Sequence, residues 1–221
     1  MKCNKVAADY SLYLVTDRRL SLGRSNQEVV AAAVAGGVSC VQLREKNLDT
    51  RSFVAEAEAL MSLLQPLRIP LIINDRVDIA LAVGADGVHL GQNDMKIEDA
   101  RRLLGNSKII GISAECLDHA VRAEKAGADY IGISPVYATA TKADTAPPLG
   151  PEGVAEIRRR VRLPLVAIGG IHRENSATVL QAGADGLAVV SAIVQAASPQ
   201  EAARELLRGI QQTRRLLGRN D

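Results

Sequence analysis

Short apolar runs alternate with segments of helical periodicity along the whole chain, and this alternation most strongly limits the possible folds. Eight runs have strand length. Parallel strands joined by right-handed helical crossovers build a parallel sheet, and eight of them favour its closure. We therefore expect an α/β fold, a single (β/α)8 TIM barrel over residues 1–221. The expected strands are 11–16, 38–43, 70–74, 86–89, 108–112, 129–133, 164–168 and 185–189, and the main helices are 26–35, 51–64, 97–104, 117–126, 152–159 and 175–182.

The composition agrees with such a barrel. Hydrophobic residues make up 47% of the 221 residues, but aromatic residues only 2%, with one Phe and no Trp. We therefore expect a core of Ala, Val, Ile and Leu. Branched aliphatic residues dominate the inner layers of parallel barrels, and barrels of this length commonly form one domain.

The charges and cysteines argue against several classes of protein. The net charge is +2 and the basic residues are spread out, which does not indicate a nucleic-acid partner. No apolar run reaches about 18 residues and no leader-like segment is present, so we expect no membrane partner. The three cysteines, Cys3, Cys40 and Cys116, are odd in number and lack metal-ligand spacing. We therefore expect no disulfide framework, and a cytoplasmic location.

A glycine motif recurs before the second, fourth, sixth and eighth expected strands, at residues 35–38, 83–86, 126–129 and 182–185. Its period of about 45 residues is typical of repeated supersecondary units. Each glycine would end a helix in the left-handed conformation and lead into the next strand. Because barrels carry their function at the opposite ends of the strands, we interpret these glycines as structural.

Two aspartates follow neighbouring strands. Asp75 comes directly after the third strand, and Asp94 comes shortly after the fourth. Parallel pairing would bring both carboxylates to one end of the sheet. Mg²⁺ binds one or two carboxylates together with waters and substrate phosphate oxygens, so the pair is a candidate magnesium site. The alternative is that either aspartate caps the helix that follows it.

The second strand runs into Gln42, Arg44 and Lys46, which would share one side if the extended conformation continues. Arg offers a bidentate fork to phosphate and Lys a point charge, so these residues suit a phosphorylated or diphosphorylated substrate. The alternative is a solvated turn in which the cations pair with Glu45 and Asp49.

A second candidate phosphate site follows the seventh and eighth strands. Gly169 and Gly170 would let the backbone approach an anion, and Val190 and Ser191 would offer N–H groups at a helix start. Barrels frequently bind phosphate there, although a tight glycine turn is the simpler interpretation. Two phosphate-directed regions across one barrel mouth indicate an enzyme that joins or exchanges groups between a metal-bound diphosphate and a second, simpler phosphate ester.

The long segment 134–151 is a candidate lid over this mouth. The three histidines, His89, His119 and His172, do not form a metal triad by spacing, and His89 is more typical of a hydrogen-bonded wall residue. No nucleophile elbow, Walker loop or dinucleotide fingerprint is present.

The order and spacing of eight short motifs resemble the thiamine-phosphate synthase family over nearly the whole chain. The motifs lie at residues 13–17, 42–46, 74–75, 89–94, 111–113, 139–142, 169–170 and 190–191. The family couples 4-amino-2-methyl-5-hydroxymethylpyrimidine diphosphate to 4-methyl-5-(2-phosphooxyethyl)thiazole and releases diphosphate. The resemblance therefore implies small phosphorylated substrates and Mg²⁺ as the cofactor.

The resemblance also implies roles for individual residues. Asp75 and Asp94 would ligate Mg²⁺. The residues expected to hold the pyrimidine diphosphate are Gln42, Arg44, Lys46, Asn74, Ser113 and Lys142. Those expected to hold the thiazole phosphate are Thr139, Ala140, Thr141, Gly170, Val190 and Ser191.

The implied mechanism is a dissociative substitution. Mg²⁺ and oriented cations stabilise the departing diphosphate, and the thiazole nitrogen attacks the pyrimidine methylene cation. Lys142, Arg44 and Ser113 are the expected catalytic residues. The lid that carries Lys142 would exclude water, so no protein nucleophile is required.

Two other functions stay open. A thiazole tautomerase shares this barrel but has a His in the loop after the fifth strand, where this chain has Ser113-Ala114-Glu115. A non-catalytic barrel that binds thiamine precursors is the other alternative. The apolar stripe of residues 201–217, with Leu206, Ile210 and Leu217, predicts a last helix packed on the barrel, or alternatively a homodimer contact.

Overall fold

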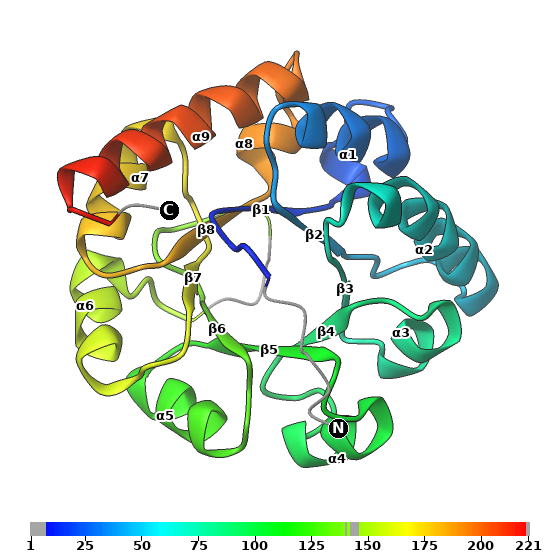
Figure 1. Cartoon of the computed structure of the whole chain (residues 1–221), viewed down its shortest axis with the longest axis horizontal. Helices are drawn as coiled ribbons and strands as arrows, with labels where there is room; N and C mark the ends of the chain where they lie inside the picture. Colours follow the sequence, from blue (N-terminus) through cyan, green and yellow to red (C-terminus); the bar gives the residue numbers. More distant parts are fainter. Residues whose placement is uncertain (1–7, 140, 142–145, 220–221) are drawn as a thin grey trace.

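Eight parallel strands close into a barrel in the computed structural model, which describes residues 8–139, 141 and 146–219 (Figure 1). Each strand pairs with its neighbours in the chain, and β8 pairs with β1. The expected (β/α)8 TIM barrel is therefore confirmed. The strands are β1 (Leu12–Val15), β2 (Cys40–Leu43), β3 (Leu71–Asn74), β4 (Gly87–Leu90), β5 (Ile109–Ala114), β6 (Tyr130–Ile133), β7 (Leu165–Ala167) and β8 (Gly186–Val189).

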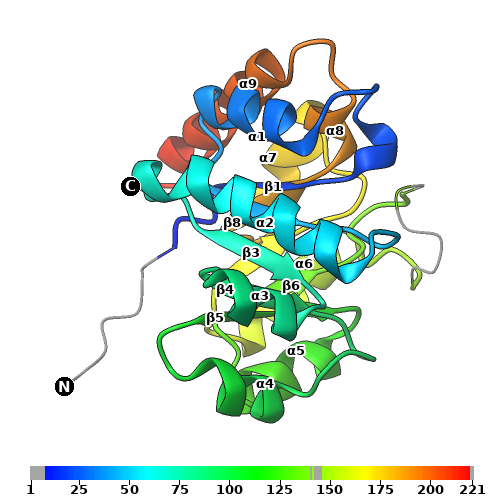
Figure 2. The same cartoon turned by 90° about the vertical axis from the view of Figure 1, so that its right-hand side faces the viewer.

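The helices form a ring around the barrel, which Figures 1 and 2 show from two directions. They are α1 (Asn26–Ala35), α2 (Thr50–Leu64), α3 (Val77–Val83), α4 (Ile97–Leu104), α5 (Leu117–Lys125), α6 (Gly150–Arg160), α7 (Arg173–Gln181), α8 (Ser191–Val194) and α9 (Pro199–Leu216). The expected helices are present, with ends displaced by at most about two residues. The short helices η1 (Arg18–Leu20), η2 (Gln65–Leu67) and α8 contain too few residues for sequence periodicity to predict.

Side chains that accept backbone hydrogen bonds fix the starts of several helices. Ser25 begins α1 with a capping box, in which its hydroxyl accepts from the Glu28 N–H and the Glu28 carboxylate accepts from the Ser25 N–H. Asp49 begins α2 by accepting from the Ser52 N–H at 3.0 Å. Asp49 is therefore a helix cap, which is not the role that the solvated-turn alternative gave it.

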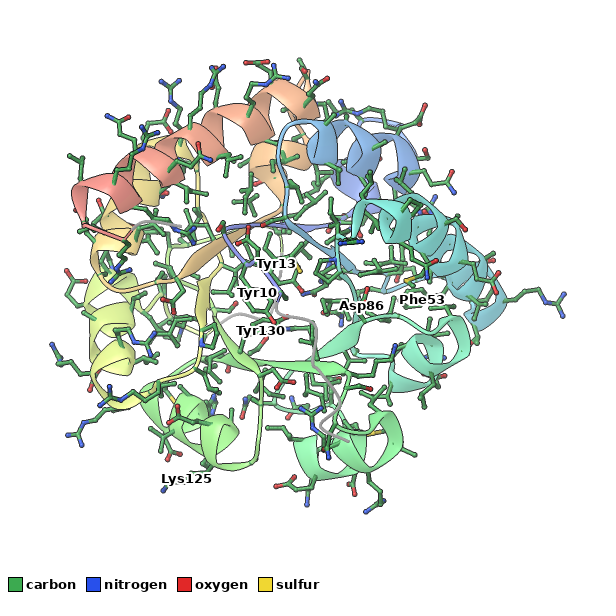
Figure 3. The ribbon with its side chains drawn as sticks, viewed as in Figure 1. Tyr10, Tyr13, Phe53, Asp86, Lys125 and Tyr130 are labelled. Carbon is green, nitrogen blue, oxygen red and sulfur yellow. The ribbon has the colours of Figure 1, made fainter. Side chains whose placement is uncertain are left out.

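The sheet separates two cores of different composition. The outer core between strands and helices is aliphatic apart from Phe53, as expected. The barrel interior instead contains Tyr13 and Tyr130, which are among the largest fully buried side chains. The ring of Tyr10 packs on Tyr130 with 4.6 Å between centroids, and Figure 3 shows these tyrosines gathered within the ring of strands. The expectation of a core without aromatic residues is therefore wrong for the barrel interior.

The glycine motifs do end helices as predicted. Gly84, Gly127 and Gly183 adopt positive φ angles of 69°, 90° and 112°. In the first motif the left-handed residue is Gly37, with φ 105°, whereas Gly36 keeps a negative φ of −86°. In the first motif Gly37, and not Gly36, therefore corresponds to the glycines of the other three. With this alignment Ser39 occupies the position of the aspartates that end the other motifs.

These terminal residues hold the sheet together at its amino end. The Ser39 hydroxyl accepts from the Leu12 N–H of β1 at 3.2 Å. The equivalent carboxylates are those of Asp86, Asp129 and Asp185, which accept from the N–H groups of Leu71, Ile110 and Leu165. Each of these four side chains accepts a hydrogen bond from a backbone N–H group near the amino end of the preceding strand. The motif is therefore structural, as expected.

The last helix, α9, packs against α1 and α7. Its stripe residues Leu206 and Ile210 are buried, which confirms the packing interpretation, while Leu217 beyond its end is 38% exposed. The homodimer stays a prediction.

None of the helices in the described ranges is long and apolar enough to cross a membrane.

We expect Ile210→Ala to lower the free energy of unfolding by about 2–5 kcal/mol, because the truncation leaves a cavity against the barrel. Leu216→Ala on the same helix is the control; its side chain is 80% exposed, so it should change stability by less than about 0.5 kcal/mol. Denaturant unfolding measures both. Equal losses, or a dimer that Ile210→Ala dissociates without loss of monomer stability, would contradict this packing.

Candidate active site at the carboxyl ends of the strands

A cavity of about 540 Å³ opens at the carboxyl ends of the strands. Every site residue that the sequence predicts within the described part of the chain lines it. These residues are Gln42, Arg44, Lys46, Asn74, Asp75, Asp94, Ser113, Thr139, Thr141, Gly170, Val190 and Ser191. The predicted residues Ala140 and Lys142 lie outside the described residues. The two expected phosphate regions therefore share one cavity.

The two aspartates are not helix caps. The residues at the cap positions of α3 and α4 are Arg76 and Lys96, and neither helix has a side-chain cap. Asp75 has a positive φ of 62°, a backbone conformation that residues other than glycine rarely adopt. Its N–H donates to the His89 carbonyl at 2.9 Å. The Asp94 carboxylate accepts from the Gly91 N–H at 2.6 Å. Both carboxylates are therefore held at the cavity.

Neighbouring groups shift the pKa values of the two aspartates in opposite directions. Burial acts to raise the pKa of Asp75, but hydrogen bonds with Lys46 and Asp94 outweigh it and hold this pKa below its usual value. Burial and the adjacent Asp75 carboxyl raise the pKa of Asp94. Lys46 forms an ion pair with Asp75. The second negative charge of the pair is thus disfavoured unless a cation compensates it.

The donor set fits a hard divalent cation. Carboxylate oxygens are the ligands that Mg²⁺ prefers, and it fills its remaining positions with waters and substrate phosphates. Among the described residues, no group of three or more His, Cys, Asp and Glu side chains is arranged to hold a metal ion. A metal at Asp75 and Asp94 would therefore need oxygen ligands other than described carboxylates, such as waters and substrate phosphates.

The cationic turn after β2 faces the same cavity although its strand ends at Leu43. The Arg44 N–H donates to the Thr16 hydroxyl at 3.0 Å, and its guanidinium lies 3.3 Å from the buried Asp17 carboxylate. The Glu45 carboxylate accepts from an amide N–H of Asn26 at 2.7 Å instead of pairing with Lys46. The solvated-turn alternative is therefore not supported.

Asn74 and Ser113 present polar atoms to the cavity from β3 and β5. Asn74 is buried, and its side-chain nitrogen has no hydrogen-bond partner among the described residues. A buried donor without a partner is costly, which suggests that a bound molecule supplies the acceptor. The Ser113 hydroxyl lies 2.8 Å from His89 Nε2. The expectation that His89 is a hydrogen-bonded wall residue is confirmed.

The opposite side of the cavity is formed by backbone after β7 and β8. Gly170 has a φ of 62°, and a Cβ there would lie 2.6 Å from the Ala138 carbonyl oxygen, so the position requires glycine. The Asn175 side chain donates to the Gly170 carbonyl at 2.8 Å. The Arg24 guanidinium donates to the Val194 carbonyl at 2.8 Å, near the end of α8. This backbone is therefore held in place before any ligand binds.

Several lining residues were not predicted from the sequence. Tyr13, Gln92, Glu115 and Tyr130 line the cavity, and the buried Asp17 orients Arg44. Gln92 donates to the Ser113 carbonyl at 2.7 Å. Tyr13 and Tyr130 could have been identified from the sequence. Each lies in an otherwise aliphatic strand of a protein that has few aromatic residues.

Comparisons with known proteins agree with the geometry. The family model described as thiamine monophosphate synthase matches residues 12–193. Thiamine-phosphate synthase from Albidiferax ferrireducens is 58% identical over 195 residues, which cover 88% of this chain and 89% of the relative. The relative of the same name from Chloroflexus aurantiacus is 53% identical over 198 residues, 90% of this chain and 91% of that protein.

A solved structure supports the same conclusion. Thiamine phosphate pyrophosphorylase from Pyrococcus furiosus superposes with a TM-score of 0.86 at 40% identity, and the match covers 93% of this chain and 98% of that one. The resemblance inferred from the motifs is thereby confirmed, including the assignment as a transferase enzyme. The chain belongs to the thiamine monophosphate synthase family.

Proposed function

We propose that the enzyme condenses 4-amino-2-methyl-5-hydroxymethylpyrimidine diphosphate with 4-methyl-5-(2-phosphooxyethyl)thiazole, giving thiamine phosphate and diphosphate with the help of Mg²⁺. One observation carries the proposal. The cations and carboxylates after β2, β3 and β4 and the glycine and serine backbone after β7 and β8 line one cavity. In Figure 1 the two groups of strands lie on opposite sides of the barrel. A diphosphate and a phosphate ester can thus be held facing each other.

The diphosphate side consists of Arg44, Lys46 and Asn74. The guanidinium offers a fork to phosphate oxygens, and the Asn74 nitrogen, which has no partner in the described part of the protein, can donate to the substrate. Mg²⁺ held by Asp75 and Asp94 would stabilise the charge that develops on the leaving diphosphate. The ion would also supply a counter-charge for Asp75, so that the Lys46 ammonium could bind a phosphate oxygen.

The reaction we propose is a dissociative substitution. Oriented donors and cations stabilise the departing diphosphate, and the aminopyrimidine ring supports the methylene cation that remains. Arg44, Ser113 and Lys142 take part in this step by binding the diphosphate. The thiazole nitrogen then attacks the cation. Because the nucleophile belongs to the second substrate, the protein needs no Ser, Cys or His nucleophile.

The thiazole substrate is held by its phosphate. The backbone of Gly170, Val190 and Ser191 surrounds this side of the cavity, and barrels often bind phosphate at these loops. Thr139 and Thr141 approach from the segment after β6, where the Thr141 N–H donates to the Thr139 hydroxyl at 3.2 Å. Ala140 completes the proposed set. We also retain a homodimer and a cytoplasmic location as predictions from the sequence.

Purified protein with Mg²⁺ and both precursors should form thiamine phosphate and diphosphate in equal amounts, and a chelator should stop the reaction. Chromatography and a phosphate-release assay measure the two products. Binding of both precursors without product would favour the precursor-binding barrel. Isomerisation of the thiazole without condensation would favour the tautomerase.

Asp75→Asn should lower kcat by about a hundredfold or more, because one charge that holds the metal is lost. Its affinity for the thiazole phosphate should change by less than about twofold. Asp78→Asn, three residues along the chain on an exposed turn of α3, is the matched control and should keep wild-type activity. Equal loss of turnover and thiazole binding in Asp75→Asn would show that the metal site is misplaced.

Lys142→Ala should lower the rate by about tenfold and raise the share of the hydrolysed pyrimidine alcohol, because water then reaches the cation. Lys125→Ala is the control, since Lys125 lies at the end of α5 and points away from the barrel in Figure 3. The ratio of alcohol to thiamine phosphate is the measurement. An unchanged ratio would contradict the role of Lys142 in excluding water.

A further inference from the structure

A continuous chain of hydrogen bonds crosses the barrel interior from β2 to β5. The Gln42 side-chain nitrogen donates to the Tyr13 hydroxyl at 3.0 Å, and the Tyr13 and Tyr130 hydroxyls lie 3.0 Å apart. The Tyr130 hydroxyl lies 2.8 Å from His89 Nδ1, and His89 Nε2 lies 2.8 Å from the Ser113 hydroxyl. All five side chains line the cavity. The chain thus joins two residues on different strands that we expect to bind the pyrimidine diphosphate.

The barrel makes room for this chain with two glycines. A Cβ at Gly111 would lie 2.0 Å from Tyr130 Cζ, and a Cβ at Gly132 would lie 2.8 Å from His89 Cε1. These glycines are on β5 and β6, where Gly111 pairs with Tyr130 and Gly132 with Ser113. Any other residue type would displace one of the two rings. The positions of the tyrosine and the histidine are therefore set by the sheet itself.

The chemistry of the first members gives the chain a direction. An amide N–H can only donate, so the Tyr13 oxygen accepts from Gln42 and the Tyr13 hydrogen is left for Tyr130. The neighbouring Cys40 thiol influences Tyr13 as well, but a thiol is a weak acceptor and competes poorly. Burial raises the pKa of both tyrosines well above the usual range, so their hydroxyls keep their hydrogens.

The same direction continues to the other end. Tyr130 accepts from Tyr13, so its own hydrogen is directed to His89 Nδ1. A histidine whose Nδ1 accepts carries its hydrogen on Nε2, and it then donates to Ser113. In the reverse order the Tyr13 oxygen would face two donors, and its own hydrogen would have no acceptor in the chain. Successive bonds of one direction also strengthen one another.

We propose that this chain fixes His89 as its Nε2–H tautomer and makes it a positioning residue, so that Ser113 presents its hydroxyl hydrogen to an acceptor on the substrate. At the other end Gln42 lines the cavity, and because its nitrogen is bound to Tyr13, its carbonyl oxygen is the acceptor that it can offer a ligand. One acceptor and one donor on opposite walls suit an aminopyrimidine, which carries an amino group and ring nitrogens. This assignment of the substrate rests on the proposed function; the direction of the chain does not.

The tautomer can be measured without substrate by ¹⁵N NMR of histidine-labelled protein. The protein contains three histidines, and the resonances that disappear in His89→Asn belong to His89. We expect the Nδ1 resonance at the position of an unprotonated nitrogen and the Nε2 resonance at that of a protonated one. A hydrogen on Nδ1 in the wild-type protein would overturn the proposal.

Three variants test which neighbour sets the tautomer. Ser113→Ala should keep it, because Tyr130 imposes it, whereas Tyr130→Phe should abolish the preference for Nε2–H. Tyr10→Phe is the matched control: its ring packs 4.6 Å from that of Tyr130, but its hydroxyl has no hydrogen bond to any described residue. Should Tyr130→Phe fail to fold, the wild-type and Ser113→Ala spectra still decide the question.

Kinetics separate positioning from a merely structural role. Tyr130→Phe should lower kcat about tenfold and leave KM for the thiazole phosphate unchanged, while Tyr10→Phe keeps both. A folded Tyr130→Phe variant with wild-type thermal stability, tautomer and kcat would overturn the proposal. A wild-type protein that forms no thiamine phosphate but shows the expected tautomer would contradict the proposed function and leave the chain intact.

Discussion

The parallel pairing that closes β8 onto β1 is the constraint on which the rest of the structure depends. Because all eight strands run in the same direction, their carboxyl ends lie at one rim of the barrel. Residues far apart in the sequence, such as Gln42 and Ser191, therefore line one cavity. Closure also brings opposite strands close enough for Tyr13 of β1 to meet Tyr130 of β6. The site and the hydrogen-bonded chain that supports it are both consequences of this closure.

Within that cavity the cationic side chains are paired with carboxylates. Arg44 is paired with the buried Asp17, which orients it, and Lys46 is paired with Asp75. Burial and the adjacent Asp75 carboxyl raise the pKa of Asp94, whereas hydrogen bonds with Lys46 and Asp94 outweigh burial and hold the pKa of Asp75 below its usual value. In our account, Mg²⁺ supplies a compensating charge when the diphosphate arrives. We therefore propose that metal binding and substrate binding depend on each other.

The sequence predicts the barrel and the residues at the strand ends, because strands and turns leave local patterns and parallel pairing fixes which ends meet. Asp75, Asp94 and Gly170 were found in this way. The hydrogen bonds from Gln42 to Ser113 could not be predicted in this way, because each joins a different pair of strands, and the bonds of Tyr130 to Tyr13 and His89 cross the barrel interior. The tyrosines in the interior were missed for a different reason, because the low aromatic content predicted a purely aliphatic core.

The most direct test is a crystal structure of the protein with Mg²⁺, diphosphate and thiamine phosphate. Our account predicts the metal between Asp75 and Asp94, with the diphosphate beside Arg44 and the ester phosphate against the backbone of Gly170 and Ser191. A metal bound away from both aspartates, or both phosphorylated groups on the same side of the barrel mouth, would contradict it.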